Sequence, residues 1–170
     1  MRNIILVGMP GSGKSTIGVV LAKKMGYRFI DSDIIIQDKY EKTLEQLIEE
    51  YSDAGFIQIE NDVNKGIQVE RTVIATGGSA VYGKEAMEHF KEIGTVIYLE
   101  VPEEELKIRL GSLKERGVVS NGKTTVEEIF EDRKALYQKY ADITFCQEHK
   151  PLRDSVEELY NRIQEMNDYE

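Results

Sequence analysis

A glycine-rich segment at residues 8–15 restricts the fold of this chain more than any other part of its sequence. It reads G-M-P-G-S-G-K-S, which matches the phosphate-binding pattern G-x-x-x-x-G-K-[ST]. The aliphatic run before it, residues 4–7, is typical of a strand buried on both faces. Apolar residues after it recur at helical spacing, at Ile17, Leu21 and Met25. The sequence therefore predicts a strand, a phosphate-binding loop and a helix in direct succession.

The rest of the chain continues this alternation of short apolar runs and longer amphipathic segments. Further strands are predicted at residues 28–30, 72–75, 95–99 and 143–145. Helices are predicted at about residues 44–51, 55–70, 84–91, 102–115 and 126–140, and from 151 onward. Thr43 and Thr125 each begin a capping-box sequence. Strands separated by helices favour an α/β fold, here a three-layer αβα sandwich with a five-stranded parallel sheet and a small lid.

Length and composition limit the classes of protein that fit. The 170 residues suffice for one domain, residues 1–170, and hardly for two. The net charge of −9 argues against a nucleic-acid partner, because phosphate backbones are bound by clustered basic residues. No apolar run approaches the ~20 residues of a membrane span, so we expect no membrane partner. The lone Cys146 fits a reducing compartment, and we expect a cytoplasmic monomer.

The glycine-rich loop has a direct chemical interpretation. Its glycines let successive backbone N–H groups point at one phosphate, and the following helix contributes the positive end of its dipole. Lys14 is expected to reach the β- and γ-phosphates of ATP, and the Ser15 hydroxyl to bind Mg²⁺. The predicted nucleotide-binding residues of the loop are Gly11, Ser12, Gly13, Lys14, Ser15 and Thr16.

Two observations narrow the nucleotide-binding class. The chain is too short for a motor domain and has no guanine-reading N-K-x-D segment, so a small-molecule kinase is favoured. Asp31 and Asp33 follow the second predicted strand, and the carboxyl ends of parallel strands face the ligand. In extended chain these two carboxylates would point the same way, towards metal and acceptor. The alternative is a helix N-cap, because Asp33 precedes the isoleucine run at residues 34–36.

At this point the sequence resembles the shikimate kinase family, within the nucleoside monophosphate kinase-like group, over nearly its whole length. The glycine-rich loop resembles the ATP site of that family, and Asp31, Ser32 and Asp33 resemble its D-[ST]-D motif. The resemblance implies that Asp31 helps to hold Mg²⁺, largely through water. It also implies that Asp33 binds the hydroxyls of the acceptor and takes the proton.

Two further segments carry the resemblance to the acceptor side. Residues 76–81 read T-G-G-S-A-V and resemble the family's T-G-G-G-A-V segment. This resemblance implies that Gly77, Gly78 and Ser79 contact the acceptor. Arg133 begins R-K-A-L-Y, which resembles the R-x-x-L-Y helix whose arginine binds the acceptor carboxylate.

The remaining basic residues are assigned in the same way. Arg116 falls in a predicted lid at about residues 112–124, where the resemblance and a polar loop both favour stabilisation of the transferred phosphoryl group. Arg109 matches an arginine near the nucleotide, and Lys150 more weakly matches the adenine-contacting loop. Residues 33–70 would form the helices on the acceptor side.

Three departures from the family pattern concern the acceptor. The family's F-R-x-x-E segment reads F-I-Q-I-E at residues 56–60, so Ile57 replaces an arginine that would be a second anchor for the shikimate carboxylate. Ser79 replaces the third glycine, and the lid's R-P-L-L reads R-G-V-V at residues 116–119. Lys65, on the same helix face as Ile57, either supplies a replacement charge or is a solvated surface residue.

The sequence thus predicts a kinase that transfers the γ-phosphoryl group of ATP to a hydroxyl, with the 3-hydroxyl of shikimate as the acceptor that the resemblance implies, in aromatic amino acid biosynthesis. The alternatives are another small acceptor, or a nucleotide-binding module without catalysis. Glu60 either orients Arg133 or lies on a solvated helix face. In an acidic chain, ATP requires locally concentrated positive charge. The basic residues expected at the crevice are Lys14, Arg109, Arg116, Arg133 and Lys150.

Overall fold

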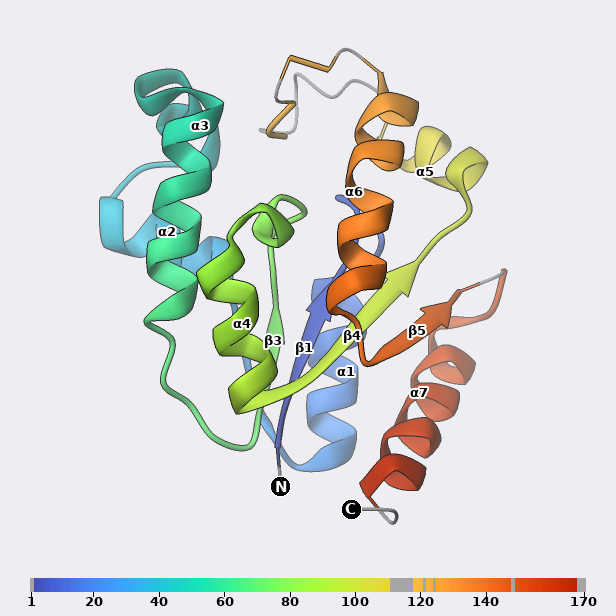
Figure 1. The fold of residues 1–170 in the computed structure, drawn as a ribbon. Coiled ribbons are helices and arrows are strands. Elements are labelled where there is room, and N and C mark those ends of the chain that lie inside the picture. Colours follow the sequence, from blue (N-terminus) through green and yellow to red (C-terminus); the bar gives the residue numbers. More distant parts are fainter. Residues whose placement is uncertain (1, 111–117, 121, 124, 148, 168–170) are drawn as a thin grey trace.

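The structure is a computed structural model, and it describes residues 2–110, 118–120, 122–123, 125–147 and 149–167 (Figure 1). Five strands form one sheet in the order β2-β3-β1-β4-β5, and every neighbouring pair is parallel. The strands are β1 (Asn3–Val7), β2 (Arg28–Asp31), β3 (Thr72–Ala75), β4 (Gly94–Glu100) and β5 (Ile143–Cys146). The predicted five-stranded parallel sheet is therefore confirmed.

The helices alternate with these strands as the sequence predicts. They are α1 (Lys14–Met25), α2 (Ser32–Tyr40), α3 (Leu44–Lys65), α4 (Lys84–Ile93), α5 (Glu103–Leu110), α6 (Val126–Tyr140) and α7 (Leu152–Asn167), with a short 3-10 helix, η1, at Ala80–Tyr82. Thr43 and Thr125 both form complete capping boxes, which confirms the predicted starts of α3 and α6.

The two helices predicted at residues 44–51 and 55–70 are both present within α3. The two helical segments join across a kink at Ser52, whose backbone leaves the helical region at φ 66° and ψ 172°. The second segment ends at Lys65, five residues before the predicted end at Glu70, because Gly66 forms the C-cap. A glycine after the last helical turn is a common stop signal.

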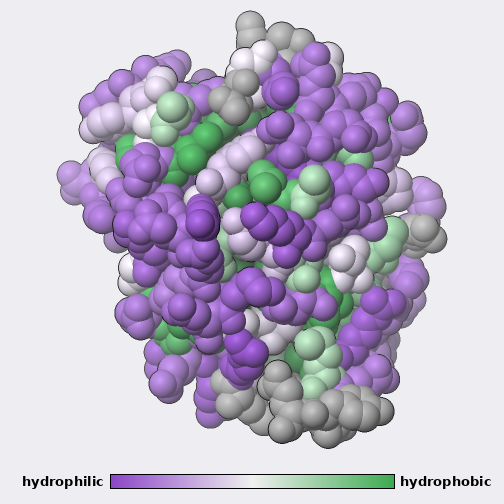
Figure 2. Space-filling view, in the orientation of Figure 1, coloured by the Kyte–Doolittle hydropathy of each residue, from purple (hydrophilic) through white to green (hydrophobic). Residues whose placement is uncertain are grey.

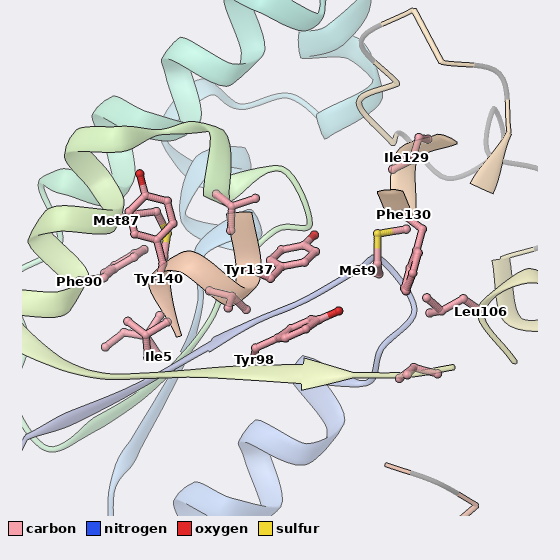
Figure 3. Packing of buried hydrophobic residues seen from close by; sticks show 14 of the residues in the cluster. Ile5, Met9, Met87, Phe90, Tyr98, Leu106, Ile129, Phe130, Tyr137 and Tyr140 are labelled. Carbon is pink, nitrogen blue, oxygen red and sulfur yellow. The ribbon is translucent and has the colours of Figure 1, made fainter. Parts of the chain in front are cut away.

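The central strand β1 explains the three layers of the fold. Its side chains alternate between the two faces of the sheet, as the pleat requires. Ile4 and Leu6 pack with α1 and α7, whereas Ile5 and Val7 pack with α4 and α6. Figure 3 shows the second of these clusters from close by, with the aromatic rings of α6 above β4. The sheet is thus covered on both faces (Figure 1).

The outer surface is mostly hydrophilic on the face seen in Figure 2, where hydrophobic residues form small scattered patches. Within the described parts of the chain, no helix combines the length and the apolar character that crossing a membrane would require.

Candidate active site

A cavity of about 360 Å³ opens at the carboxyl ends of β1, β2 and β3, where parallel sheets usually bind ligands. The segments around it are the glycine-rich loop, the start of α2, the kinked helix α3, the turn after β3, and α6. The described residues that line it are Pro10, Gly11, Gly13, Lys14, Ser15, Thr16, Asp33, Leu44, Phe56, Glu60, Thr76, Gly77, Gly78, Ser79, Leu110, Val118, Val119 and Arg133.

The glycine-rich loop has the predicted strand–loop–helix context. Gly13 is the N-cap of α1 and adopts φ 88°, a backbone conformation that side chains with a Cβ rarely take. Lys14 is 7% exposed, and its Nζ donates to the carbonyl oxygens of Gly8 and Met9, each at 2.8 Å. Burial lowers the pKa of Lys14 to about 8. The lysine therefore braces its own loop and lies at the site where phosphates are expected.

Ser15 and Asp31 meet on one side of the cavity. The Ser15 hydroxyl donates to Asp31 Oδ2 at 2.6 Å, and Asp31 Oδ1 accepts from the backbone N–H of Asp33 at 3.0 Å. Mg²⁺ prefers hard oxygen ligands, and it is commonly held by one or two carboxylates together with substrate phosphates and water. A hydroxyl and a carboxylate oxygen fit that set. The described residues contain no cluster of three His, Cys, Asp or Glu side chains suited to a metal ion.

Contrary to the sequence prediction, Asp31 and Asp33 do not both lie in extended chain. Asp31 ends β2 and is the N-cap of α2, whereas Asp33 already lies in the first turn of that helix. The two carboxylates do not therefore point the same way from an extended chain: one faces Ser15 and the other lines the cavity. The N-cap alternative is wrong for Asp33, because the N-cap of α2 is Asp31. Burial is the main reason that the pKa of Asp33 rises to about 6, and the nearby Asp31 carboxylate is the next.

The turn after β3 is packed between two carboxylates. Ser79 Oγ donates to Glu60 Oε1 at 2.6 Å, and Glu60 is 1% exposed, so the solvated-face alternative for Glu60 is wrong. A Cβ on Gly77 would lie 2.5 Å from Glu60 Oε2 and 2.6 Å from Asp33 Oδ1. Only glycine lets the backbone approach both carboxylates so closely. Burial raises the pKa of Glu60 to about 7, with the Asp33 charge as the next cause.

Arg133 reaches the cavity from α6. It is 1% exposed, and its Nη2 donates to the Val119 carbonyl at 2.5 Å, while Nε and Nη1 have no hydrogen-bond partner among the described residues. Tyr137, one turn later, donates from its hydroxyl to the Gly78 carbonyl at 2.5 Å and stacks on Tyr98. Arg133 thus places a guanidinium beside the turn after β3, and the Tyr137 hydroxyl holds the Gly78 carbonyl of that turn in place.

The other predicted basic residues are distributed differently. Arg109 Nη1 donates to the Gly11 carbonyl at 3.1 Å, so this side chain contacts the glycine-rich loop. Lys150 is exposed, pairs with Glu158, and is not among the residues that line the cavity. Arg116 and most of the predicted lid, residues 112–124, lie outside the described residues. The prediction that positive charge is concentrated at the crevice needs correction for the described residues. The cavity is lined by two basic side chains, Lys14 and Arg133, but also by the two carboxylates of Asp33 and Glu60.

Sequence reasoning missed Gln147. This side chain is buried, and its Nε2 donates to the Ser12 carbonyl at 2.7 Å. The signal was its position, since Gln147 directly follows β5 at the same sheet edge as the glycine-rich loop.

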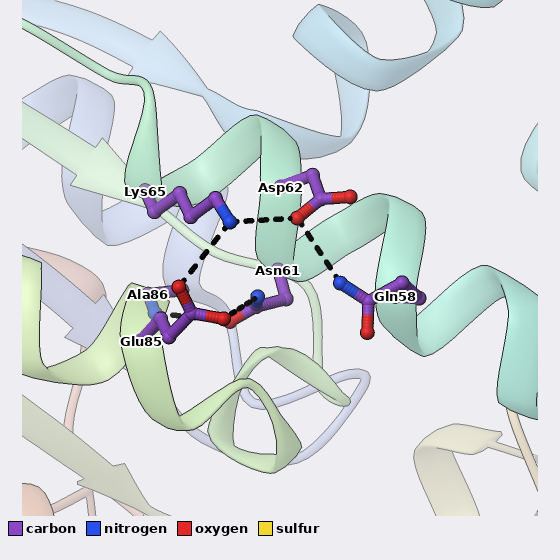
Figure 4. A network of polar contacts seen from close by, with 6 residues as sticks. All are labelled: Gln58, Asn61, Asp62, Lys65, Glu85 and Ala86. Carbon is purple, nitrogen blue, oxygen red and sulfur yellow. Dashed lines mark hydrogen bonds and ion pairs between the residues drawn. The ribbon is translucent and has the colours of Figure 1, made fainter.

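Lys65 supplies no replacement charge to the cavity. Its Nζ lies 3.0 Å from Asp62 and 3.3 Å from Glu85 on the outer side of α3 (Figure 4). Asn61, beside it, accepts from the backbone N–H of Ala86 at 3.0 Å. This network fastens α3 to the start of α4, and the surface alternative for Lys65 is confirmed.

Comparison with known proteins gives a consistent result. The family model described as shikimate kinase matches residues 10–164. The chain is 37% identical to the shikimate kinase of Persephonella marina over 164 residues, covering 96% of this chain and 99% of the relative. It resembles the structure of an Acinetobacter baumannii shikimate kinase in complex with shikimate, with a TM-score of 0.88, 31% identity, and coverage of 97% of this chain and 94% of the other. The shikimate kinase structure from Aquifex aeolicus matches with a TM-score of 0.82 and 31% identity, over 95% and 96% of the two chains.

Proposed function

The chain belongs to the shikimate kinase family, a family of ATP-dependent phosphotransferases, and from this premise we propose that it transfers the γ-phosphoryl group of ATP to the 3-hydroxyl of shikimate. The observation that carries this proposal is the cavity itself. It is lined by the glycine-rich loop for phosphates, by Asp33 for a hydroxyl and by Arg133 for a carboxylate. These three groups match the phosphates of ATP, the acceptor hydroxyl and the acceptor carboxylate, which the reaction requires the protein to bind.

In the proposed reaction, the acceptor hydroxyl oxygen forms a bond to the γ-phosphorus while the bond to the bridging oxygen of ADP breaks. Asp33 orients the hydroxyl and takes its proton. Its raised pKa, about 6, makes the carboxylate a better base than an exposed aspartate and leaves it mostly ionised at neutral pH. Lys14 leaves the loop carbonyls and neutralises charge on the phosphates. Most of the rate enhancement then comes from positioning and electrostatic stabilisation.

Mg²⁺ neutralises charge on the β- and γ-phosphates in reactions of this class. We propose that Ser15 and Asp31 hold it, because they supply hard oxygen ligands. Gly11, Ser12, Gly13 and Thr16 would bind phosphates through the loop. Arg109, which contacts the Gly11 carbonyl, would bind the nucleotide beside them. Gly77, Gly78 and Ser79 would contact the acceptor.

Several expectations stay predictions. The role of Arg116, the lid at residues 112–124 and a single domain over residues 1–170 are among them. The same holds for the Lys150 contact with adenine, the monomeric state and the cytoplasmic location.

The test is an ADP-release assay with ATP, Mg²⁺ and shikimate, with the phosphorylated position identified by NMR. Asp33→Asn should lower kcat by about 10²–10⁴. Lys65→Met, on the outer surface of α3, should leave kcat unchanged. Nucleotide binding without turnover of shikimate would contradict the proposal. So would phosphorylation at another hydroxyl.

A further inference from the structure

The acceptor side of the cavity contains an uncommon arrangement of charge. Besides Lys14 of the glycine-rich loop, its charged described residues are Asp33, Glu60 and Arg133. Glu60 and Arg133 are both 1% exposed. Within the part of the chain that the structure describes, Glu60 Oε2 and two guanidinium nitrogens of Arg133 have no hydrogen-bond partner. A buried carboxylate and a buried guanidinium thus stand at the same cavity with open hydrogen-bonding capacity.

Glu60 and Arg133 approach adjacent residues of one turn. A Cβ on Gly77 would lie 2.5 Å from Glu60 Oε2, and a Cβ on Gly78 would lie 2.9 Å from Arg133 Nη1. The Arg133 charge also lowers the pKa of Glu60, in opposition to the larger effect of burial. Above about pH 7, where Glu60 is ionised, an acceptor carboxylate bound at Arg133 is close to the carboxylate of Glu60, and repulsion between the two opposes the attraction.

No second cation among the described residues strengthens Arg133 on this side. Ile57, one turn before Glu60, is half-buried and packs against an apolar cluster that contains Ile36 and Val119. It does not line the cavity. Glu60 instead receives its hydrogen bond from an uncharged group, the Ser79 hydroxyl.

The wall around this charge pair also suits an uncharged group. Leu44, Phe56, Val118 and Val119 line the cavity together with Glu60 and Arg133. Transfer of a carboxylate from water to such surroundings costs much more than transfer of an amide or a hydroxymethyl group. The apolar wall therefore penalises a charged acceptor more than a neutral one.

We propose that this site also phosphorylates neutral polyols, meaning cyclic acceptors that present the hydroxyl to Asp33 but carry an uncharged group where shikimate has its carboxylate. The inference rests on the proposed function, and the chemical step is the same. The acceptor hydroxyl oxygen binds the γ-phosphorus, ADP departs with the electrons of the broken P–O bond, and the proton goes to Asp33. Charged and neutral acceptors differ only in whether a carboxylate contributes to binding at Arg133.

The first experiment compares kcat/KM for shikimate with kcat/KM for its carboxamide in the native protein, at a pH above the Glu60 pKa of about 7 so that this carboxyl is ionised. A buried charge pair that loses one partner weakens by about thirty-fold or more. We expect a preference for shikimate smaller than that. A preference of about thirty-fold or more overturns the inference and leaves the proposed function standing. Failure to phosphorylate either compound overturns both.

A second experiment assigns the effect to Glu60. Glu60→Gln removes the opposing charge and keeps the shape, so it should raise the preference for shikimate over the carboxamide by about tenfold. Ile57→Arg should change the preference in the same direction. Asp62→Asn, a carboxylate on the outer side of the same helix, should leave it unchanged. If Glu60→Gln lowers kcat/KM equally for both acceptors, Glu60 is a structural residue and the inference is wrong.

Discussion

The buried carboxyl of Glu60 makes the stability of the protein depend on pH in a way that one substitution should remove. The pKa of this group rises from its ordinary value of 4.5 to about 7, mainly because of burial. A raised pKa means that the folded state favours the protonated form. Its contribution to stability is fully present below pH 4.5 and is lost as the pH rises through about 7. Glu60→Gln carries no titrating proton at this position and should lose nothing over the same range.

The size of the effect follows from the pKa difference. Each pKa unit corresponds to about 1.36 kcal/mol. The native protein should therefore lose about 3 kcal/mol of unfolding free energy from this group between about pH 4.5 and pH 8. The substitution also changes the hydrogen bond with Ser79, but that change adds an offset that does not follow the titration.

The assay is urea unfolding of the native protein and Glu60→Gln at a series of pH values, without ligands. The difference in unfolding free energy should move by about 3 kcal/mol in favour of the variant as the pH rises. Asp62→Asn is a matched control, because Lys65 holds the pKa of Asp62 below its usual range. The difference in unfolding free energy between Asp62→Asn and the native protein should stay constant above about pH 5. A flat difference for Glu60→Gln would refute the assignment of a protonated, buried carboxyl.

Two further substitutions test contacts around the cavity. Gly77→Ala places a Cβ 2.5 Å from Glu60 Oε2 and should lower kcat/KM for the acceptor by at least about tenfold, with little change in the KM for ATP. Gly66→Ala, whose Cβ meets only ordinary contacts, is its control in the same steady-state assay, and equal losses in both variants would contradict the explanation. Gln147→Ala removes the hydrogen bond to the Ser12 carbonyl and should raise the KM for ATP by about fivefold while the KM for the acceptor stays constant. Gln138→Ala, exposed on α6, should change neither constant, and an unaltered KM for ATP in Gln147→Ala would exclude a role for that contact.

The fold was predictable because its signals are local. The aliphatic run of β1, the glycine-rich loop and the two capping boxes each depend on a few neighbouring residues, and all are present as predicted. The kink at Ser52 and the burial of Glu60 are different, because they depend on what packs against α3. A carboxylate on an amphipathic helix normally faces water. Nothing in the local sequence shows that Ser79 lies opposite Glu60.

The candidate site was predictable where a motif specifies a position, and less so elsewhere. Lys14, Asp33 and Arg133 come together in one cavity as expected. Gln147 was missed because a single glutamine after a strand forms no pattern, and only the parallel sheet places it beside Ser12. Lys150 pairs with Glu158, which lies eight residues further along the chain, and its contact with the nucleotide stays a prediction. Charge alone did not indicate which partner this lysine would find.

The order of the strands also determines when the site can exist during synthesis. Strand β1 is made before the other four strands, yet its partners are β3 and β4, with Ile4 opposite Val73 and Thr95. Contacts this distant in sequence close slowly, and the unpaired strand is exposed until its partners arrive. A nascent chain that ends before β4 has its phosphate-binding residues but lacks one side of the sheet that supports them. We therefore expect the ability to bind ATP to appear only after β4 has been made.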